Sequence, residues 1–395
     1  MAESTERTIT TQCCIAGAGP AGMVLGLLLA RAGVRVTLLE KHPDFERDFR
    51  GETVHPSTLQ LLSELGIRTG FDSVRRARIH ERKLPQVDGL HPIIDFRGML
   101  PLPYRALVPQ WDFLAFLADE ARRHPGFALH MQAEVTDLMR DGRRITGVVA
   151  HTPDGPLRVH ADVVVGCDGR QSEVRARAGL SRRDRAVPMD VLWFRLPRAK
   201  ADTAESFAVA ARGHCMALLQ RGRHWQVAYI LQRGWAPGML RRPIEELREV
   251  IEQRVGFLAG RTAALQSWAD VKRLEVRVDR LKRWFQPGLL LIGDAAHAMA
   301  SNDAVGINLA IQDAVTAAHA LIPALRRGQA PSTVDLARVQ LGRSLPTQLV
   351  HAVQQQIHER MLAPMRRTGE VTPLLRGLLE LRSVPTRLHT PNPAT

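Results

Sequence analysis

Cysteine and tyrosine are scarce in this chain of 395 residues, which has four cysteines and two tyrosines. The cysteines show neither the spacing of a metal or redox motif nor the density of a disulfide scaffold; they are Cys13, Cys14, Cys167 and Cys215. We therefore expect no metal centre, and reduced thiols in a cytoplasmic protein. The two tyrosines, Tyr104 and Tyr229, are too few for an extended tyrosine proton relay.

Long apolar runs are also absent. No stretch of about 18 uncharged apolar residues occurs, so no transmembrane helix is expected. The first residues include acids and no apolar core, which is not the pattern of a secretory signal. HExxH, GxSxG and Walker A motifs are missing, and with them the usual signatures of zinc proteases, serine hydrolases and P-loop enzymes.

Lysine is rare as well: five of the 54 basic residues are lysines, which leaves 49 arginines. The net charge of +14 could suggest a nucleic-acid-binding protein. The arginines are dispersed, however, and do not form a basic stripe interleaved with aromatic residues. We expect no nucleic-acid partner, and a charge that steers an anionic cofactor or substrate.

A glycine-rich loop stands out near the start. Residues 12–16 predict a buried strand, residues 20–32 a helix and residues 34–40 a second strand. In the loop GAGPAG the first glycine permits a tight turn, the second a close approach to pyrophosphate, and the third close helix packing. The acid that ends the second strand suits the hydroxyls of an unphosphorylated ribose, which favours FAD or NAD over NADP. The candidate cofactor residues here are Gly17, Gly19, Pro20, Ala21, Gly22, Glu40 and Lys41.

Two further acids follow predicted buried strands. Asp168 comes after residues 161–166, and Asp294 comes shortly after residues 289–292. Such an acid can bind ribose or ribitol hydroxyls, or it can cap a helix. Each acid alone leaves both interpretations open, but the three motifs together predict a long dinucleotide held from both ends. The candidate cofactor residues of these segments are Asp168, Gly293, Asp294, Gly306, Ile307 and Asn308.

The middle of the chain lacks a phosphate-type loop. Strand-like runs at 191–196, 216–220 and 225–231, with a helix at 244–255, predict a separate sheet domain. Trp225 and Tyr229 lie four residues apart on one of these strands, hence on one face. They line a substrate pocket or pack in a core; the pattern favours neither.

The remaining patterns are clear but carry less chemistry. They predict helices at 56–65 and 110–124, a hairpin within 134–151, and mainly helical structure from 314 to about 381.

In this order the motifs resemble the class A flavoprotein monooxygenases, which have the fold of para-hydroxybenzoate hydroxylase. The resemblance covers residues 12–320. It implies that GAGPAG and Glu40 bind the pyrophosphate and ribose of FAD, that Asp168 serves FAD and the nicotinamide cofactor, and that Asp294 holds the ribityl chain. Arg50 would lie near the flavin ring, and Gln110 would contact the ribityl chain. His297, in the same motif as Asp294, would be structural or adjacent to FAD.

The resemblance also implies an activity. NADH or NADPH would reduce FAD, and O2 would then form a flavin C4a-hydroperoxide that hydroxylates an aromatic or polycyclic small molecule. The protein would be a monomer or homodimer, without integral membrane segments.

The implied architecture is an α/β fold: an FAD-binding Rossmann-type domain, glutathione-reductase-like, with an inserted β-sheet substrate domain and C-terminal helices. The FAD-binding domain would comprise residues 1–75, 106–185 and 279–340, and the substrate domain residues 76–105 and 186–278. Residues 341–395 would form a C-terminal helical segment with a disordered tail.

One loop departs from the family pattern. Ser301 stands where the family has proline, and Asp303 where it has glycine. Asp303 is either a general base or an ordinary turn residue. With Arg50 and His55 it completes our set of candidate catalytic residues; His55 alone could equally be a solvated loop residue. Residues 301–304 also leave open an FAD enzyme that does not hydroxylate, such as a cyclase or dehydrogenase, or a binding module without activity.

Overall fold

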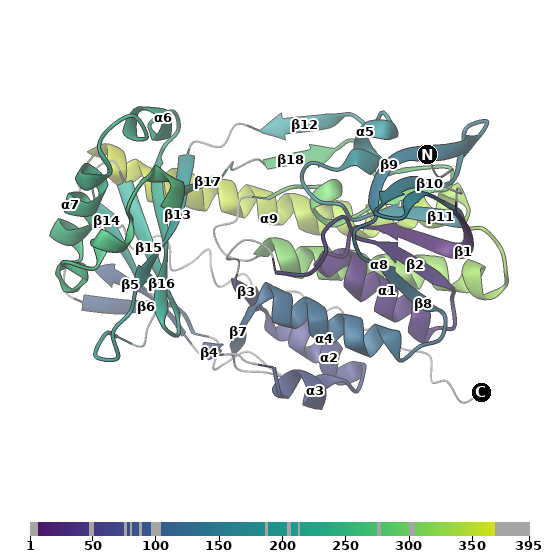
Figure 1. The fold of residues 1–395 in the computed structure, drawn as a ribbon, viewed down its shortest axis with the longest axis horizontal. Coiled ribbons are helices and arrows are strands. Elements are labelled where there is room, and N and C mark those ends of the chain that lie inside the picture. Colours follow the sequence, from purple (N-terminus) through teal and green to yellow (C-terminus); the bar gives the residue numbers. More distant parts are fainter. Residues whose placement is uncertain are drawn as a thin grey trace.

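The computed structural model describes residues 7–46, 51–74, 77–79, 81–86, 89–95, 104–185, 189–203, 207–211, 214–274, 278–299 and 305–367. These form two lobes (Figure 1): a main lobe on an eight-stranded sheet and a sheet lobe on a five-stranded sheet. Arg50, Ser301, Asp303 and the predicted C-terminal tail lie outside the described residues.

Parallel pairing dominates the main-lobe sheet. Its path runs β19-β20-β11-β1-β2-β8, and all neighbours from β20 to β8 are parallel. The predicted hairpin of β9 and β10 extends the sheet antiparallel to β11. The strands are β1 (Arg7–Ala16), β2 (Val36–Leu39), β8 (Phe127–His130), β9 (Glu134–Asp141), β10 (Arg144–Thr152), β11 (Gly155–Gly166), β19 (Phe285–Gln286) and β20 (Leu289–Leu291).

Helices cover this sheet and bury most of its apolar residues. α1 begins with Pro20, whose missing N–H is harmless in a first turn, and it packs against both α4 and α8. Strand residues Ile15, Leu38 and Val165 are fully buried with helix residue Leu25, each contributing about 1.5–3 kcal/mol. The helices are α1 (Pro20–Arg31), α2 (Pro56–Glu64), α3 (Arg68–Asp72), α4 (Gln110–Arg122), α5 (Glu173–Arg177), α8 (Val305–Arg326) and α9 (Thr333–Arg367). The predicted α/β fold with a parallel Rossmann-type core is confirmed.

The sheet lobe is antiparallel, in the order β14-β15-β16-β13-β17. One face packs on α7, at the outer end of the molecule (Figure 1), in a core that includes Val227 and Leu247. The three predicted strands and the predicted helix are confirmed as β13 (Met189–Pro197), β15 (His214–Arg221), β16 (His224–Gln232) and α7 (Ile244–Arg254). The region also contains β14 (Phe207–Ala211), β17 (Lys272–Leu274) and α6 (Ala236–Met239), which were not predicted from the sequence.

Smaller sheets lie between and beside the lobes. β3 (Gly51–Val54), β7 (Arg105–Pro109) and β4 (Ala77–Ile79) form one sheet, and β5 (Glu81–Gln86) with β6 (Gly89–Asp95) forms a hairpin near β14.

Two strands connect the lobes and pair with each other. β12 (Arg182–Arg185) and β18 (Val278–Leu281) are antiparallel and occupy the gap between the lobes in Figure 1. Their ends fall at the proposed domain boundaries near 185 and 279. The proposed boundary at 340 has no counterpart, because α9 runs unbroken across it. The division into domains otherwise stays a proposal.

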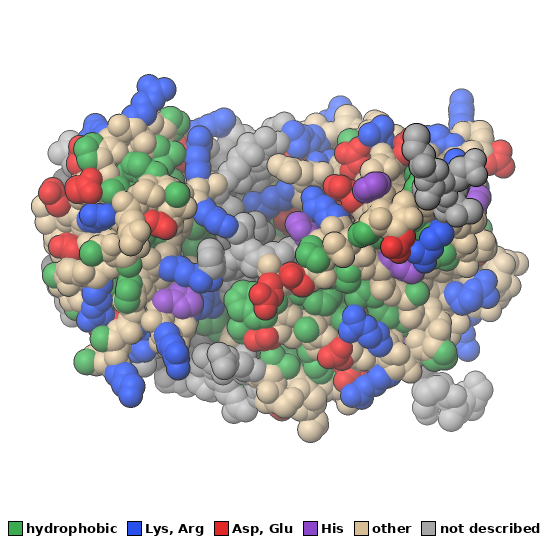
Figure 2. All heavy atoms as spheres, in the orientation of Figure 1, with side chains coloured by type: hydrophobic (Ala, Val, Ile, Leu, Met, Phe, Trp, Pro, Cys, Tyr) green, Lys and Arg blue, Asp and Glu red, His purple; other side chains and the backbone are tan. Residues whose placement is uncertain are grey.

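The basic side chains are spread over both lobes on the face shown in Figure 2. Within the described part of the chain, no helix is long and apolar enough to span a membrane.

Candidate cofactor and active site

Glycines bring the three predicted motifs into contact. Gly17 has φ +100°, and a β-carbon there would lie 2.6 Å from the carbonyl oxygen of Cys167, next to Asp168. A β-carbon on Gly22 would lie 2.0 Å from the Gly17 oxygen. A β-carbon on Gly293 would lie 3.3 Å from that of Ala21. The loop after β1, the loop after β11 and the turn after β20 therefore meet at one edge of the sheet, as carboxyl ends of parallel strands do.

Glu40 ties the first loop to the end of β2. Its buried carboxylate accepts hydrogen bonds from the backbone N–H of Ala18 at 2.8 Å and of His42 at 3.0 Å. Lys41, by contrast, is exposed. The carboxylate therefore stands beside the N-terminus of α1, where an anion is favoured by the unsatisfied helix amides.

Gly19 differs from its two neighbouring glycines. It has an ordinary backbone conformation, with φ −71° and ψ −179°, directly before Pro20. A β-carbon there would have no atom closer than the Cys167 oxygen at 4.0 Å. Its open side faces away from protein atoms and leaves room for a ligand to approach the backbone.

Asp168 carries a carboxylate oxygen without a protein partner. Its Oδ2 accepts a hydrogen bond from the N–H of Val174 at 3.0 Å, which ties it to α5. Its Oδ1 is buried and makes no hydrogen bond within the described part of the chain. Burial raises the pKa of this carboxyl, and hydrogen bonds to Ser172 and nearby backbone groups oppose the rise. Asp168 thus contacts the start of the helix and still offers an acceptor to a ligand, so both sequence interpretations have support.

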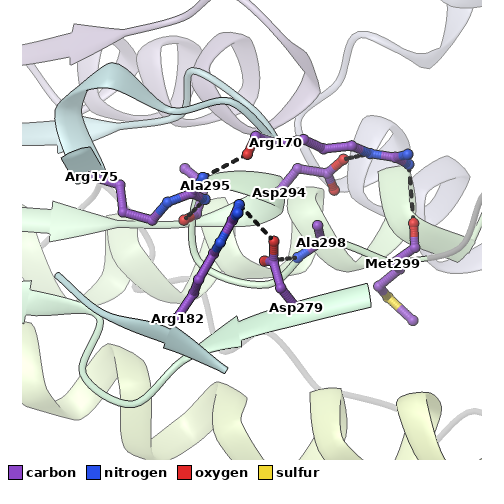
Figure 3. A network of polar contacts seen from close by, with 8 residues as sticks. All are labelled: Arg170, Arg175, Arg182, Asp279, Asp294, Ala295, Ala298 and Met299. Carbon is purple, nitrogen blue, oxygen red and sulfur yellow. Dashed lines mark hydrogen bonds and ion pairs between the residues drawn. The ribbon is translucent and has the colours of Figure 1, made fainter. Parts of the chain in front are cut away.

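Asp294 lies in the short 3₁₀ turn η4 (Gly293–Ala295) and binds Arg170 (Figure 3). Arg170 Nε donates to Asp294 Oδ2 at 3.0 Å, and its Nη2 donates to the Met299 carbonyl at 3.0 Å. Arg175 donates to the carbonyls of Ala295 and Arg170. The segment after β11 and the turn after β20 are therefore joined by two arginines.

The start of α8 completes this cluster. A β-carbon on Gly306 would lie 3.9 Å from Asp294 Oδ1. Ile307 and Asn308 are buried. The Asn308 Oδ1 accepts hydrogen bonds from the backbone N–H of His55 and the hydroxyl of Thr58, both at 2.9 Å. Asn308 therefore fixes the first turn of α2, a contact across some 250 positions that the sequence does not signal.

His55 stands at this junction and is partly buried. Its ring nitrogen Nε2 is buried and makes no hydrogen bond to the residues that the structure describes. Burial, and then the nearby positive charge of Arg105, lower the pKa of His55 well below 6.5. The imidazole is accordingly neutral at pH 7. Gln110 is the first residue of α4, as predicted, and is half-buried.

Trp225 and Tyr229 pack in a core. Both are fully buried among the residues that pack on α7. Trp225 Nε1 also donates to Asp202 at 3.0 Å. The opposite face of the sheet carries Trp193, Ala217 and Ala228 in a second apolar cluster, which includes Val278 of the connecting strand β18. The sequence could not say which face of the sheet packs on α7. Because Trp225 and Tyr229 lie on that face, the opposite face is the candidate substrate-binding surface, which we call the substrate wall.

The geometry fits FAD. Among the described residues, Gly19 has its open side beside a helix N-terminus and Asp168 has an unpartnered acceptor. Glu40, Asp168 and Asp294 follow three parallel strands of one sheet, β2, β11 and β20, with β1 between β2 and β11. Hydroxyl-rich linkers and pyrophosphate need such acceptors and amides. Among the described residues, no three His, Cys, Asp or Glu are grouped to hold a metal ion.

Comparisons with known proteins support the same cofactor. Residues 10–352 match the FAD binding domain family. The chain is 36% identical over 335 residues to the 6-methylpretetramide 4-monooxygenase of Streptomyces rimosus, covering 80% of this chain and 76% of that protein. It is 28% identical over 349 residues to 3-hydroxybenzoate 6-hydroxylase 1 of Aquipseudomonas alcaligenes, covering 82% and 86%.

A solved structure shares the fold. The probable FAD-dependent monooxygenase PqsL of Pseudomonas aeruginosa superposes with a TM-score of 0.74 at 22% identity, over 91% of this chain and 97% of that one. Together with the motif geometry, these matches place the chain in the FAD binding domain family, as an FAD-dependent oxidoreductase of the class A flavoprotein monooxygenase type.

Proposed function

We propose that this enzyme uses NADH or NADPH and O2 to hydroxylate a polycyclic aromatic molecule. The 36% identity to a 6-methylpretetramide monooxygenase over 80% of the chain is the observation that carries this proposal. The match to a hydroxybenzoate hydroxylase is weaker, at 28% identity. When bound, FAD supplies the electron transfer and the oxygen-transfer chemistry, and the protein positions the substrate and excludes water.

The wall of the sheet lobe supports a large apolar substrate. Its cluster consists of Met189, Val191, Cys215, Ala228 and Ile230, with Trp193 and Ala217 packed against it. The partly buried indole of Trp193 can stack on a flat ring system.

The cofactor roles follow the three motifs. The loop from Gly17 to Gly22 would hold the pyrophosphate, Glu40 the ribose, and Asp294 the ribityl chain, with Gln110 and Asp168 beside it. Arg50 near the flavin ring and Asp303 as a base remain predictions outside the described residues.

His55 is our candidate for handling a substrate proton. Its neutral imidazole has an unpartnered Nε2, which can accept a proton or hydrogen bond from a phenolic hydroxyl. The Asn308 contact fixes the backbone at this residue. A base with a lowered pKa is a weak proton acceptor. We therefore assign His55 the roles of orienting the substrate hydroxyl and relaying its proton.

The proposal is tested with a panel of substrates that compares polycyclic phenols with monocyclic hydroxybenzoates. The purified protein should be yellow, and tricyclic or tetracyclic phenols should accelerate its oxidation of NADH or NADPH more than monocyclic hydroxybenzoates do. The product should gain one oxygen atom by mass spectrometry. Flavin-free protein that takes up no FAD would contradict the proposal, as would nicotinamide oxidation with only hydrogen peroxide as product across the panel.

The non-hydroxylating alternative rested on residues 301–304. The relatives named above do not favour it, because both are monooxygenases or hydroxylases by name.

A further inference from the structure

The turn that carries Asp294 is held from behind by one carboxylate. Asp313, on α8 and fully buried, uses its Oδ2 to accept a hydrogen bond from the Gly293 N–H at 3.0 Å. The same oxygen contacts His297 Nε2 at 2.5 Å. Gly293 and His297 are the two ends of the turn, which the His297 N–H closes onto the Gly293 carbonyl. Asp313 thus fixes both ends of the segment 293–297, which contains Asp294.

The other oxygen of Asp313 belongs to α9. Arg343 Nε donates to Asp313 Oδ1 at 2.7 Å, and Arg343 is itself buried. Burial would raise the pKa of Asp313, but His297 and Arg343 beside it bring the pKa below its usual value. Asp313 is therefore ionised at neutral pH and acts only as an acceptor, so His297 Nε2 carries the proton in this contact.

α9 also holds the connection between β18 and β19, which precedes the turn. The Gln340 side chain accepts a hydrogen bond from the Trp284 N–H and donates one to the Lys282 carbonyl, both at 3.0 Å. The Trp284 ring lies 4.9 Å from the His297 ring. Gln340 and Arg343 are three residues apart, hence on one side of the helix. The same side of α9 therefore contacts the approach to the turn and the residue that fixes it.

We propose that Asp313 and Arg343 are positioning residues for FAD, which hold the Asp294 turn in its binding geometry from α8 and α9. This inference rests on FAD occupying the site and is independent of hydroxylation. Neither residue need touch the cofactor. Asp313→Asn should be damaging because its amide would place a donor against Arg343 Nε or against the Gly293 N–H and His297.

A purely structural role predicts a different pattern. Loss of a buried ion pair would then destabilise the apoprotein and the FAD complex equally, and FAD affinity would not change. A positioning role lowers FAD affinity and spares ligands that need only the first loop. ADP is such a probe, because it has the pyrophosphate and ribose of FAD but no ribityl chain.

The experiment titrates FAD and ADP into the apoproteins of wild type, Asp313→Asn, Arg343→Met and Arg338→Met. Arg338 is the matched control: it lies on the same helix, but its pair with Asp335 is exposed. We expect Asp313→Asn and Arg343→Met to weaken FAD about tenfold or more while ADP stays within about twofold, and Arg338→Met to change neither. Parallel losses for both ligands, or unchanged FAD affinity, would overturn the proposal.

Arg343→Lys keeps the test decisive if the stronger variants do not fold. Lysine retains the charge but not the planar guanidinium that reaches Asp313 through Nε. We expect an intermediate loss of FAD affinity and a smaller rise in melting temperature on adding FAD. An apoprotein melting temperature that falls while the FAD-induced rise stays at its wild-type value would assign Arg343 to stability alone. Inactive enzyme with normal FAD affinities would count against the proposed reaction and not against Asp313.

Discussion

The guanidinium of Arg170 donates a hydrogen bond to the carboxylate of Asp294 at 3.0 Å, across 124 positions of the chain. Arg170 also donates to the carbonyl of Met299, which follows the same turn (Figure 3). One side chain from the loop after β11 therefore orients the acid and the exit of the turn after β20. The two motifs act as one unit.

Replacing Arg170 with leucine should weaken FAD binding about tenfold, or about 1.4 kcal/mol, because Asp294 loses the partner that orients it. Both residues are less than one-third exposed, so solvent screens their pair only in part. Arg177→Leu, which removes an exposed pair with Glu173, is the control and should have little effect. Equal FAD affinities for the two variants, by fluorescence titration, would refute the assignment.

Alanine at Gly19 and alanine at Gly22 should fail in different ways. The Gly22 change forces a methyl group to within 2.0 Å of the Gly17 oxygen, so the apoprotein should melt at a clearly lower temperature. Gly19 has space for a methyl group and an ordinary conformation, so its apoprotein should remain stable while FAD binds more weakly. Melting curves with and without FAD separate the two outcomes. A Gly19→Ala protein with wild-type FAD affinity would show that nothing approaches this face.

The two tryptophans of the sheet lobe provide a matched pair. Trp225→Ala should destabilise the protein by about 3–5 kcal/mol, because it empties a fully buried site against α7. Trp193→Ala removes a partly buried ring from the proposed substrate wall, so it should raise KM more than it lowers stability. Denaturant unfolding and steady-state kinetics measure both. If Trp193→Ala left KM unchanged, the substrate would not contact this wall.

His55 should make stability depend on pH. Its pKa is well below 6.5 in the folded protein and near 6.5 in the unfolded chain. Below 6.5 the unfolded chain binds more protons, so stability falls as the pH drops from 6.5 toward the folded pKa and is flat above 6.5. His55→Asn should flatten this dependence, whereas the exposed His319→Asn should not. The measurement is the free energy of unfolding of each variant between about pH 5 and pH 8. If its slope against pH were the same in His55→Asn as in the wild type, His55 would not be a neutral buried imidazole.

Much of the main lobe could be predicted from the sequence. The βαβ unit follows from local patterns: an apolar strand, a glycine loop with Pro20 opening a helix, and an acid ending the next strand. The three motifs together predict a long dinucleotide held from both ends. The structure confirms the strands and the helices, and it brings the loop at Gly17 against Cys167 and the turn at Gly293 against Ala21.

Other features depend on contacts that no local pattern encodes. Trp225 and Tyr229 share a face, as their spacing requires, but both faces of the sheet are apolar, so spacing could not say which faces α7. The bond from Asn308 to His55 links distant segments through one amide oxygen. Nothing in the sequence distinguishes Arg343 from the other arginines; its contact with Asp313 is visible only in the structure. α9 is continuous across the expected boundary at residue 340 and packs in part on α8.

The paired connections between the lobes extend further than β12 and β18. The N–H groups of Asp279 and Leu281 in β18 donate to the carbonyls of Ala298 and Ala296, at 3.1 and 2.8 Å, and so attach the segment after the Asp294 turn to this two-stranded sheet. Arg182 of β12 reaches Asp279 across the same ladder. The segment that follows Asp294 is therefore anchored by backbone hydrogen bonds to one of the two strands that connect the lobes, so the acid and the connection between the lobes share one hydrogen-bonded framework.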